Sequence, residues 1–456
     1  MRWSEAILLA VTFLYAQIGH RTLTFNDPTR TGGFGSGGGP GRQIQTEIYY
    51  PATTSGTNAP IRSGIYPVVV IGHGFLMPWS EYQNLWEALV PYGYVVALPR
   101  TEGSFSPSHQ DFALDLRVVA QRMVAEGQRS NSPFYQRIHP KVALMGHSMG
   151  GGCAVLAAQN FSDAHCVVGL AAANTNPSAI TAASQVSLPV LMLAGSGDSV
   201  TPPHQHQLPI YNALASPCKW YVSLIGGGHC YFANNSPTCS FGENSAGSTI
   251  TLTRNEQQAL TNTLIRPFLD AYLKDSCLGR FLDTLSALGG ITFQQRCTYQ
   301  RLSLSGQVTH PTTANLSGGS IVLSVSGGTP PYTFVWSHGY TGPNPTGLSA
   351  GTYTVQVRDR SGCIAETTFV LSLVTAFLEV PSPQVYVRWD ASQRSIQVEA
   401  PAWYQGLHWQ LISTLGGEVA AGCLETIPFQ ISLASLPSGI YQLLIGNQRF
   451  KIAHLP

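Results

Sequence analysis

One serine of the sequence lies in a pattern that is typical of nucleophiles. Ser148 is the centre of a Gly-His-Ser-Met-Gly motif over residues 146–150, directly after the apolar run 142–145 and before the small-residue run 151–159. Such a motif between a strand and a helix predicts a strained turn that lifts the hydroxyl above a sheet, with glycines where a Cβ would not fit. We therefore expect Ser148 to be a nucleophile and the backbone N–H of Met149 to stabilise an oxyanion.

A serine nucleophile needs a base to take its proton and a carboxylate to orient that base. In proteins with this motif, the acid precedes the histidine along the chain. Asp198 follows the apolar run 189–194 within Gly-Ser-Gly-Asp, and His229 follows the run 219–225 after three glycines. Both stand where predicted parallel strands end, so we expect Asp198 to orient His229 and His229 to act as the base. Asp163 is the weaker alternative for the acid.

Other histidines flank this predicted site. His73, in an Ile-Gly-His-Gly-Phe sequence, is expected to shape a turn that aims the N–H of Phe75 at the oxyanion. We expect His147 to pack at the rim of the site rather than to transfer protons. His204 and His206 form a pair that could bind zinc, but the sequence places no third ligand. An exposed loop pair is favoured there, and neither a metal nor an organic cofactor is predicted.

The elements that must position these residues are strands and helices in alternation. In the run 111–126, Phe112, Leu116 and Val119 recur at helical spacing, which predicts an amphipathic helix. Continuous apolar strands separated by helices predict an α/β domain, in which a mostly parallel sheet is covered by helices on both faces. The five predicted strands are 68–71, 95–98, 142–145, 190–193 and 221–224.

The hydrophobic pattern of the sequence changes beyond residue 302, where apolar residues no longer recur at helical spacing. Short β-branched runs such as 321–325 and 352–357, bounded by Gly, Pro, Ser and Thr, predict two small all-β, sandwich-like domains. The expected organisation is a signal peptide (1–16), a flexible glycine-rich lead-in (17–42), the α/β domain (43–300), a linker (301–315), a β repeat (316–373), a second linker (374–384) and a C-terminal β domain (385–456).

Charge and hydropathy exclude several classes of protein. The chain has 24 Lys and Arg against 23 Asp and Glu, so it lacks the basic surface of a nucleic-acid-binding protein or a polybasic membrane patch. After the first twenty residues no apolar run is long enough to span a bilayer. Residues 1–16 combine one positive charge, a short apolar stretch and a small residue at a plausible cleavage point. We expect an exported chain, with a single membrane anchor as the alternative.

The cysteines fit an oxidising compartment. Nine cysteines imply disulfides and at least one unpaired thiol, because the number is odd. Cys153 and Cys166 lie in apolar runs, where we expect buried free thiols. The partners of three others, Cys218, Cys363 and Cys423, stay open. Two disulfides are predicted from spacing, Cys277–Cys297 and Cys230–Cys239.

Residues from about Gln43 to Cys297 resemble the bacterial cutinases and poly(ethylene terephthalate) hydrolases, and more distantly dienelactone hydrolases and chlorophyllases. The motifs that carry the resemblance are Gly-His-Ser-Met-Gly-Gly-Gly (146–152), Asn-Ser-Pro-Phe-Tyr (131–135), Asp-Ser-Val (198–200), Leu-Pro-Ile-Tyr (208–211) and Gly-Gly-Gly-His (226–229). The resemblance implies a monomeric α/β-hydrolase domain with the triad Ser148, Asp198 and His229. It also implies an oxyanion hole of the Phe75 and Met149 amides, with both side chains lining the acyl subsite.

One substrate-binding position departs from that family. Polyester-active members carry Ala-Pro-Trp where this chain has Ala-Ala-Asn, so that Asn174 replaces the indole that clamps an aromatic acid. The resemblance therefore implies ester hydrolysis but not aromatic polyester cleavage. The loop 194–198 also lacks the cysteine of some polyester hydrolases, and we expect Cys230–Cys239 to steady the histidine loop instead.

The β tail resembles two other families. Residues 327–337, 347–355 and 359–363 look like one copy of the SprB-type repeat of bacterial surface adhesins. Residues 436–441 and Lys451 resemble the C-terminal sorting domain of type IX secretion, although the Asn-Pro usual near its start is absent. This implies the type IX machinery as a partner and a secreted or cell-surface location.

The sequence as a whole predicts a secreted serine ester hydrolase whose substrate is an ester or a polyester. The alternatives within the same chemistry are a lipase, a thioesterase or a peptidase, because a fold does not fix a substrate. The alternative from another class is a surface adhesin that retains a hydrolase scaffold, against which the complete set of Ser148, Asp198 and His229 argues.

Overall fold

The computed structural model describes residues 17–374 and 385–454, apart from 391–392, 438 and 447. The chain divides into two compact units: residues 1–309 with 319–371, and residues 310–318 with 372–456. The predicted signal peptide (1–16) and all but the first residue of the predicted linker 374–384 lie outside the described residues. Each unit is described by itself.

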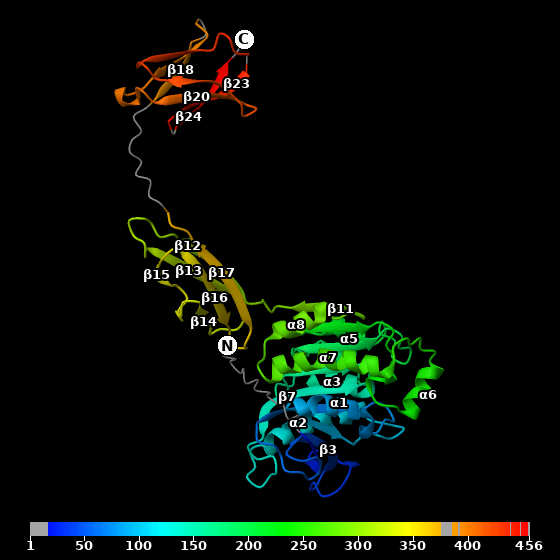
Figure 1. Cartoon of the computed structure of the whole chain (residues 1–456). Coiled ribbons are helices and arrows are strands. Elements are labelled where there is room, and N and C mark those ends of the chain that lie inside the picture. Colours follow the sequence, from blue (N-terminus) through cyan, green and yellow to red (C-terminus); the bar gives the residue numbers. More distant parts are fainter. Residues whose placement is uncertain (1–16, 375–384, 391–392, 438, 447, 455–456) are drawn as a thin grey trace, which may run out of the picture. The chain divides into compact units, whose positions relative to one another are not determined.

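A large mixed sheet forms the framework of the first unit (Figure 1). The strands at its centre are parallel. Parallel strands need crossover connections, and the helices between these strands supply them. All residues of four of these strands are buried, which explains why their sequences are continuous apolar runs. The parallel strands run in the order β6 (Val95–Pro99), β5 (Tyr66–Gly72), β7 (Ile138–His147), β8 (Cys166–Leu170), β9 (Val190–Gly195) and β10 (Cys218–Leu224).

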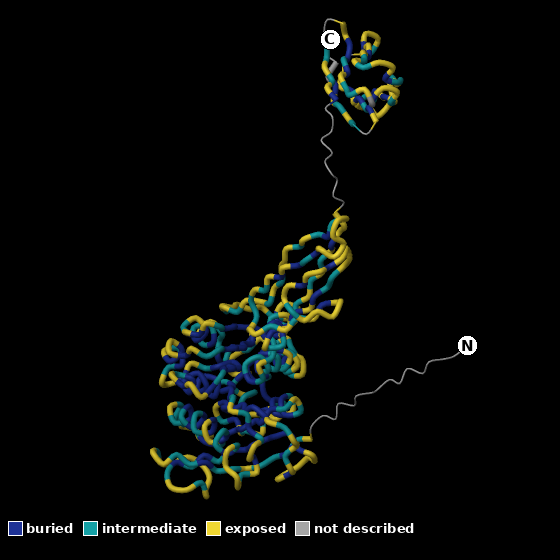
Figure 2. The backbone as a smooth tube through the Cα atoms, turned by 90° about the vertical axis from the view of Figure 1, so that its left-hand side faces the viewer, coloured by how far each residue is buried: buried dark blue, intermediate teal, exposed yellow. Residues whose placement is uncertain are grey.

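Helices cover both faces of this sheet, as predicted. Val68 and Val70 of β5 pack into one core and Val69 into the other, because successive strand side chains point to opposite faces. Buried residues gather inside the α/β domain (Figure 2). The first core includes α2 (His109–Glu126), α3 (Met149–Ala158), α4 (Ala179–Ala183) and α5 (Gln207–Ala213); the second includes α1 (Gln83–Leu89), α7 (Arg254–Leu273) and α8 (Leu278–Ala287).

The glycine-rich lead-in predicted over residues 17–42 is wrong for its first part. Residues Gln17–Asp27 form strand β1, which pairs antiparallel along the whole of β3 (Arg42–Ala52). The two strands are anchored to α2 where β1 ends and β3 begins. Arg42 and Arg30 form ion pairs with the buried carboxylate of Asp115 on α2, at 2.8 and 2.7 Å. Strand β3 pairs antiparallel with β6, and β11 (Ile291–Cys297) with β10, so antiparallel strands flank the parallel centre; the short strands β2 (Gly33–Phe34) and β4 (Gly56–Thr57) complete the sheet.

The β repeat consists of two three-stranded sheets around a small core that contains Trp336, Val355 and Ile321. The predicted linker 301–315 is wrong for residues Ser303–Thr309, which form strand β12 and pair along β13. The sheets are β12 with β13 (Gly319–Ser326) and β15 (Thr346–Leu348), and β14 (Thr333–Trp336) with β16 (Gly351–Arg358) and β17 (Ile364–Leu371).

The predicted disulfide Cys277–Cys297 is wrong. Cys297 lies opposite Cys218 in the antiparallel pair of β10 and β11, with Cα atoms 3.9 Å apart, and the two are bonded. Cys277, at the start of α8, is bonded instead to Cys363 of the β repeat, which ties the repeat to the α/β domain. The predicted pair Cys230–Cys239 is present. Cys153 and Cys166 are buried free thiols, as predicted, and Cys423 is also unpaired.

The second unit holds two further sheets around a core that includes Trp409, Leu411 and Tyr441. Its strands are short and bury some of their side chains in this core while exposing others, which explains the short β-branched runs of the sequence. The sheets are β18 (Tyr386–Asp390), β19 (Ser395–Glu399) and β22 (Phe429–Ser432), and β21 (Glu418–Cys423), β20 (His408–Ser413), β23 (Gly439–Ile445) and β24 (Gln448–His454). Among the described residues, no helix combines the length and apolar character that a bilayer crossing requires.

Candidate active site

The nucleophile elbow lies between β7, which ends at His147, and α3, which begins at Met149. Ser148 has φ 55° and ψ −120°, a strained backbone conformation for a residue with a side chain. The strain is stabilised by the surrounding backbone, since the Ser148 N–H donates to Leu170 of β8 at 2.9 Å and its carbonyl accepts from Ala173 at 2.9 Å. The elbow thus presents Ser148 at the carboxyl end of the sheet.

Glycines make this close packing possible. A Cβ on Gly146 would lie 2.1 Å from the Gly150 carbonyl oxygen, and a Cβ on Gly150 would lie 2.2 Å from the carbonyl oxygen of Gly72. The start of α3 therefore rests directly on the backbone where β5 and β7 end. No other residue type fits these positions without a shift of main chain, which is the physical reason for the motif.

Asp198 follows β9 and is buried at the same edge of the sheet. Its Oδ1 accepts hydrogen bonds from the N–H groups of Val200 and Thr201, at 2.8 and 2.9 Å. Its Oδ2 lies 2.8 Å from Nδ1 of His229 and 2.9 Å from the Thr201 hydroxyl. Burial raises the pKa of Asp198, but the hydrogen bonds from His229 and Thr201 outweigh it and hold this pKa below its usual value. The carboxylate is therefore ionised and aimed at the histidine.

His229 follows β10 and is also buried. Because Nδ1 faces Asp198, the imidazole has its other nitrogen, Nε2, left for proton transfer. Asp163, the alternative acid, is not part of this arrangement: it accepts a hydrogen bond from Gln121 at an exposed position. The structure thus brings Asp198 and His229 together, and it places His229 beside the elbow, since the ring centres of His229 and His147 are 4.9 Å apart.

His147 does not lie at the rim of the site, so that prediction is wrong. It is fully buried, with Nδ1 2.9 Å from the Tyr82 hydroxyl and Nε2 2.9 Å from the carbonyl oxygen of His229. Since a carbonyl only accepts, Nε2 carries the proton and Nδ1 accepts from Tyr82. Burial and the neighbouring His229 lower the pKa of His147 to about 3. A neutral His147 therefore links the elbow to the backbone of the histidine loop, and nothing in the sequence signalled Tyr82.

The proposed oxyanion amides belong to residues at the ends of adjacent strands. Gly72 of β5 is in register with Gly146 of β7, so the turn with Phe75 and the elbow with Met149 start side by side. His73 is buried, with Nε2 2.8 Å from the Thr101 carbonyl oxygen. The Phe75 side chain is 45% exposed, whereas Met149 is buried.

Asn174 is engaged in the fold at the start of α4. Its Oδ1 accepts from the Ser178 hydroxyl at 2.9 Å and from the N–H of Ile180 at 3.2 Å, and its own N–H donates to Nδ1 of His206 at 2.9 Å. His206 is half-buried, so the expectation of an exposed pair holds for His204 only. Among the described residues, no group of three or more His, Cys, Asp or Glu is arranged to hold a metal ion.

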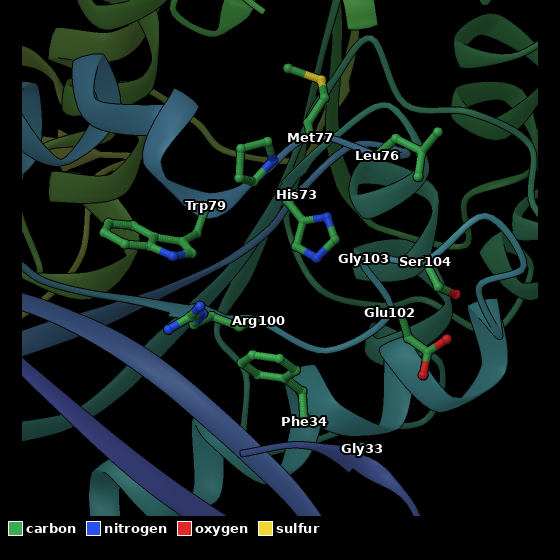
Figure 3. Close-up of a pocket in the computed structure, with 11 residues that line it drawn as sticks. Gly33, Phe34, His73, Leu76, Met77, Trp79, Arg100, Glu102, Gly103 and Ser104 are labelled. Atoms are coloured by element: carbon green, nitrogen blue, oxygen red, sulfur yellow. The ribbon is translucent and has the colours of Figure 1, made fainter.

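A cavity of about 540 Å³ lies beside the turn that carries Phe75. Figure 3 shows Leu76 and Met77 of this turn at one side of the cavity, with Trp79, Arg100 and Phe34 along the other. The Arg100 guanidinium lies 4.8 Å from the centre of the Phe34 ring. No local sequence pattern indicated this cavity, because Phe34 comes from the glycine-rich lead-in and lines the cavity only through β2.

Comparison with known proteins supports an ester hydrolase. Residues 10–245 match the family described as PET hydrolase-like, and residues 314–341 match the SprB repeat. Cutinase 1 of Thermobifida cellulosilytica is 28% identical over 232 residues, which are 50% of this chain and 79% of the relative. A cutinase of Thermobifida fusca is also 28% identical over 232 residues, 68% of its length. A bis(hydroxyethyl) terephthalate hydrolase of Streptomyces coelicolor is 27% identical over 195 residues, 42% of this chain and 56% of the relative. The chain, which also carries an SprB repeat, belongs to the PET hydrolase-like family.

Proposed function

We propose that the chain is an exported serine hydrolase that cleaves carboxylic esters through an acyl-enzyme. The observation that carries the proposal is the buried contact of 2.8 Å between Nδ1 of His229 and Oδ2 of Asp198, with the His229 ring 4.9 Å from that of His147, the residue before Ser148. The cutinase relatives, which are 26 to 28% identical to this chain over the aligned residues, support an ester as the substrate.

The proposed reaction has two steps that conserve every proton. Ser148 Oγ attacks the ester carbonyl carbon while His229 Nε2 takes the hydroxyl proton, and the amides of Phe75 and Met149 stabilise the oxyanion. The bond from carbon to the alkoxy oxygen breaks, and the alcohol leaves with the proton from His229. Water then attacks the acyl-enzyme and gives a proton to the same nitrogen, which returns it to Ser148 Oγ as the bond to the acyl carbon breaks and the acid is released.

Electrostatics support the division of roles between the histidines. Asp198 is ionised and hydrogen-bonded, so it stabilises the imidazolium that forms on His229. His147 lies near by, with ring centres 4.9 Å apart, but its pKa of about 3 keeps it neutral at the pH where esterases work. His147 therefore supports His229 without competing for the proton of Ser148.

The acyl side of the site supports a preference for esters without a large aromatic acid. Asn174 stands where polyester-active relatives are expected to carry an indole, and its amide is occupied with the start of α4. The cavity beside the turn of Phe75 is lined by the apolar side chains of Phe34, Leu76, Met77 and Trp79 and by the charged side chains of Arg100 and Glu102. We infer that aliphatic esters are cleaved faster than aromatic polyester.

We also propose that residues 385–456 are a type IX sorting domain and that residues 1–16 are a signal peptide. The motif at 436–441 and the separate compact unit support the first assignment. In a host with type IX secretion, a chain that ends at residue 374 should stay inside the outer membrane while the full chain reaches the medium or the cell surface. Equal export of both chains would contradict the assignment.

The esterase proposal is tested by covalent labelling of the serine. An active-serine fluorophosphonate should label the wild-type protein and not the Ser148→Ala variant, and mass spectrometry should find the adduct on Ser148. A series of p-nitrophenyl esters of rising chain length and a polyester film then define the substrate, with Ser148→Ala as the control. An unlabelled wild-type serine would overturn the proposal, and fast release of aromatic acid from the film would overturn the inference about Asn174.

A further inference from the structure

The segment that carries His229 is held by side chains that the triad chemistry does not use. We call residues 226–230 the histidine loop. Glu243, on α6 (Pro237–Ser245), is only 3% exposed, and its Oε1 accepts hydrogen bonds from the N–H groups of both His229 and Cys230. A Cβ on Gly228 would lie 2.6 Å from the same oxygen. The carboxylate of Glu243 is thus seated directly on the backbone of the proposed base.

Helix α7 holds the histidine loop from another side. Gln257 is fully buried, and its amide makes two hydrogen bonds of 2.8 Å to the N–H and the carbonyl of Gly228. Arg254 donates to the carbonyl groups of Cys230 and Ala233, both at 2.6 Å. Side chains therefore bind the backbone N–H and carbonyl groups of Gly228 and Cys230, on both sides of His229.

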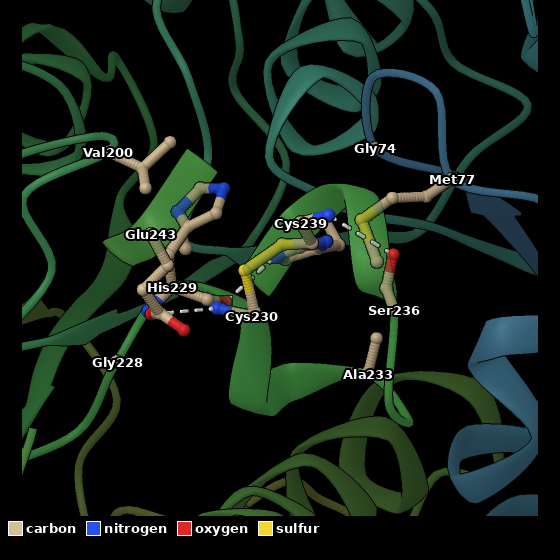
Figure 4. Close-up of a disulfide and its surroundings, with 12 residues drawn as sticks. Gly74, Met77, Val200, Gly228, His229, Cys230, Ala233, Ser236, Cys239 and Glu243 are labelled. Atoms are coloured by element: carbon tan, nitrogen blue, oxygen red, sulfur yellow. Dashed lines mark hydrogen bonds between the residues drawn. A yellow bond between two sulfur atoms is a disulfide. The ribbon is translucent and has the colours of Figure 1, made fainter. Parts of the chain in front are cut away.

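A disulfide closes α6 back onto this loop. Cys230, the residue directly after His229, is bonded to Cys239 of α6, and the Cys239 N–H donates to the hydroxyl of Ser236, the N-cap of α6. Figure 4 shows the disulfide and Glu243 close to His229, with hydrogen bonds that the backbone donates to Glu243. The bridge thus keeps the helix that carries Glu243 against the residue that Glu243 binds.

From this geometry we propose that Glu243 is a positioning residue of the reaction. It fixes the backbone of His229 through two charge-assisted hydrogen bonds, so that Nε2 stays in line with the serine, while Cys230–Cys239 keeps Glu243 in place. Asp198 holds only the imidazole and leaves the main chain of the histidine unfixed. A displacement of about 1 Å at a reacting group costs roughly 100-fold in rate, so a loose histidine loop would slow acylation. The inference rests on the proposed esterase function.

Two substitutions separate this role from the mere burial of a carboxylate. Glu243→Ala removes the acceptor, and we expect kcat for a p-nitrophenyl ester to fall about 30- to 100-fold with KM within twofold, because only the base moves. Glu243→Gln keeps a carbonyl oxygen at the same place, and we expect kcat within about fivefold of wild type. A matched control is Glu126→Ala, a buried carboxylate at the end of α2 that pairs with Arg129 and should leave kcat unchanged.

The experiment uses the full chain and follows kcat, KM, thermal unfolding and hydrogen exchange of the His229 and Cys230 amides. Faster exchange and a loss of kcat in Glu243→Ala, restored in Glu243→Gln, support the proposal; wild-type kcat in Glu243→Ala, or an equal loss in both variants, overturns it. If Glu243→Ala does not fold, Cys239→Ser decides instead, with lower kcat at unchanged KM supporting the proposal and unchanged kcat overturning it. A wild-type protein that neither turns over esters nor labels with fluorophosphonate would instead refute the esterase function itself.

Discussion

The elbow of Ser148 and the loop of His229 are held in opposite ways. Around the serine, main chain rests on main chain: Gly146 and Gly150 approach so closely that a Cβ would fall about 2 Å from a carbonyl oxygen. Around the histidine, side chains from two helices and one disulfide bind the backbone, led by Glu243 and Gln257. The elbow is rigid through its shape, whereas the histidine loop is rigid only while its polar partners are present.

This difference predicts how each half of the site fails. A substitution in the elbow forces backbone apart and should cost stability and activity together. A substitution around the histidine loop should cost activity first, because the loop can move while the sheet and its two cores stay intact. Four changes, taken from the largest expected effect to the smallest, test this contrast.

The largest effect is expected from Asp198→Asn, which acts on the histidine side alone. An amide cannot stabilise the imidazolium and favours the wrong tautomer of His229, so kcat should fall about 10³- to 10⁴-fold. Ester hydrolysis and the rate of fluorophosphonate labelling of Ser148 should fall together. Asp163→Asn is the matched control, because the Asp163 carboxylate accepts a hydrogen bond from Gln121 at an exposed position, and this variant should keep wild-type kcat. A large loss in Asp163→Asn would reverse the assignment of the acid.

Gly146→Ala tests the elbow by steric overlap. The new Cβ would lie 2.1 Å from the Gly150 carbonyl oxygen, so α3 must move away from the sheet. We expect the free energy of unfolding to fall by about 3 kcal/mol, together with a loss of activity. Urea denaturation measures the first and ester hydrolysis the second. Gly289→Ala, where a Cβ meets nothing within 4 Å, should change neither, and a fully stable Gly146→Ala would contradict the shape-based account of the elbow.

The double variant Cys230→Ser, Cys239→Ser tests the histidine loop. This bridge spans a sequence separation of 9, and opening so short a loop should lower the free energy of unfolding by about 2 to 3 kcal/mol. We also expect kcat to fall by about 10-fold, because α6 no longer keeps Glu243 in place. Cys277→Ser with Cys363→Ser opens the bridge to the β repeat, and kcat should stay at the wild-type value there. Equal kcat losses in the two double variants would remove the special role of Cys230–Cys239.

The contrast also explains what the sequence could predict. The strands at the centre of the sheet are buried on both faces, so their apolar runs identify them, and the glycines of the elbow mark Ser148. Asp198 and His229 follow such strands directly, so their places could be inferred as well. Strand β1 was missed because only two of its 11 residues are buried and polar residues interrupt its apolar ones. The features that could be predicted, the buried strands and the elbow, share one property. The sequence pattern that indicates each of them lies within the element itself.

The missed features depend on contacts between distant segments. Cys218 meets Cys297 only because β11 pairs antiparallel with β10, and no spacing rule predicts that register. Tyr82 reaches His147 from a short helix (Trp79–Tyr82) far ahead in the sequence. Glu243 looks like an ordinary polar residue until α6 folds back onto the histidine loop. The side-chain contacts that hold the histidine loop therefore have no local sequence pattern, whereas the elbow has one.

The last change acts on the pH dependence of stability and concerns His147, which joins the two halves by donating to the carbonyl of His229. Its pKa falls from 6.5 in the unfolded chain to about 3 in the folded protein, chiefly through burial. Below pH 6.5 the unfolded chain gains a proton that the folded chain refuses, so the free energy of unfolding should drop by about 1.4 kcal/mol per pH unit down to pH 3. Above pH 6.5 this contribution is constant. In His147→Gln, urea denaturation between pH 4 and 8 should show a slope that is shallower by this amount, and an unchanged slope would mean that His147 is protonated in the folded site.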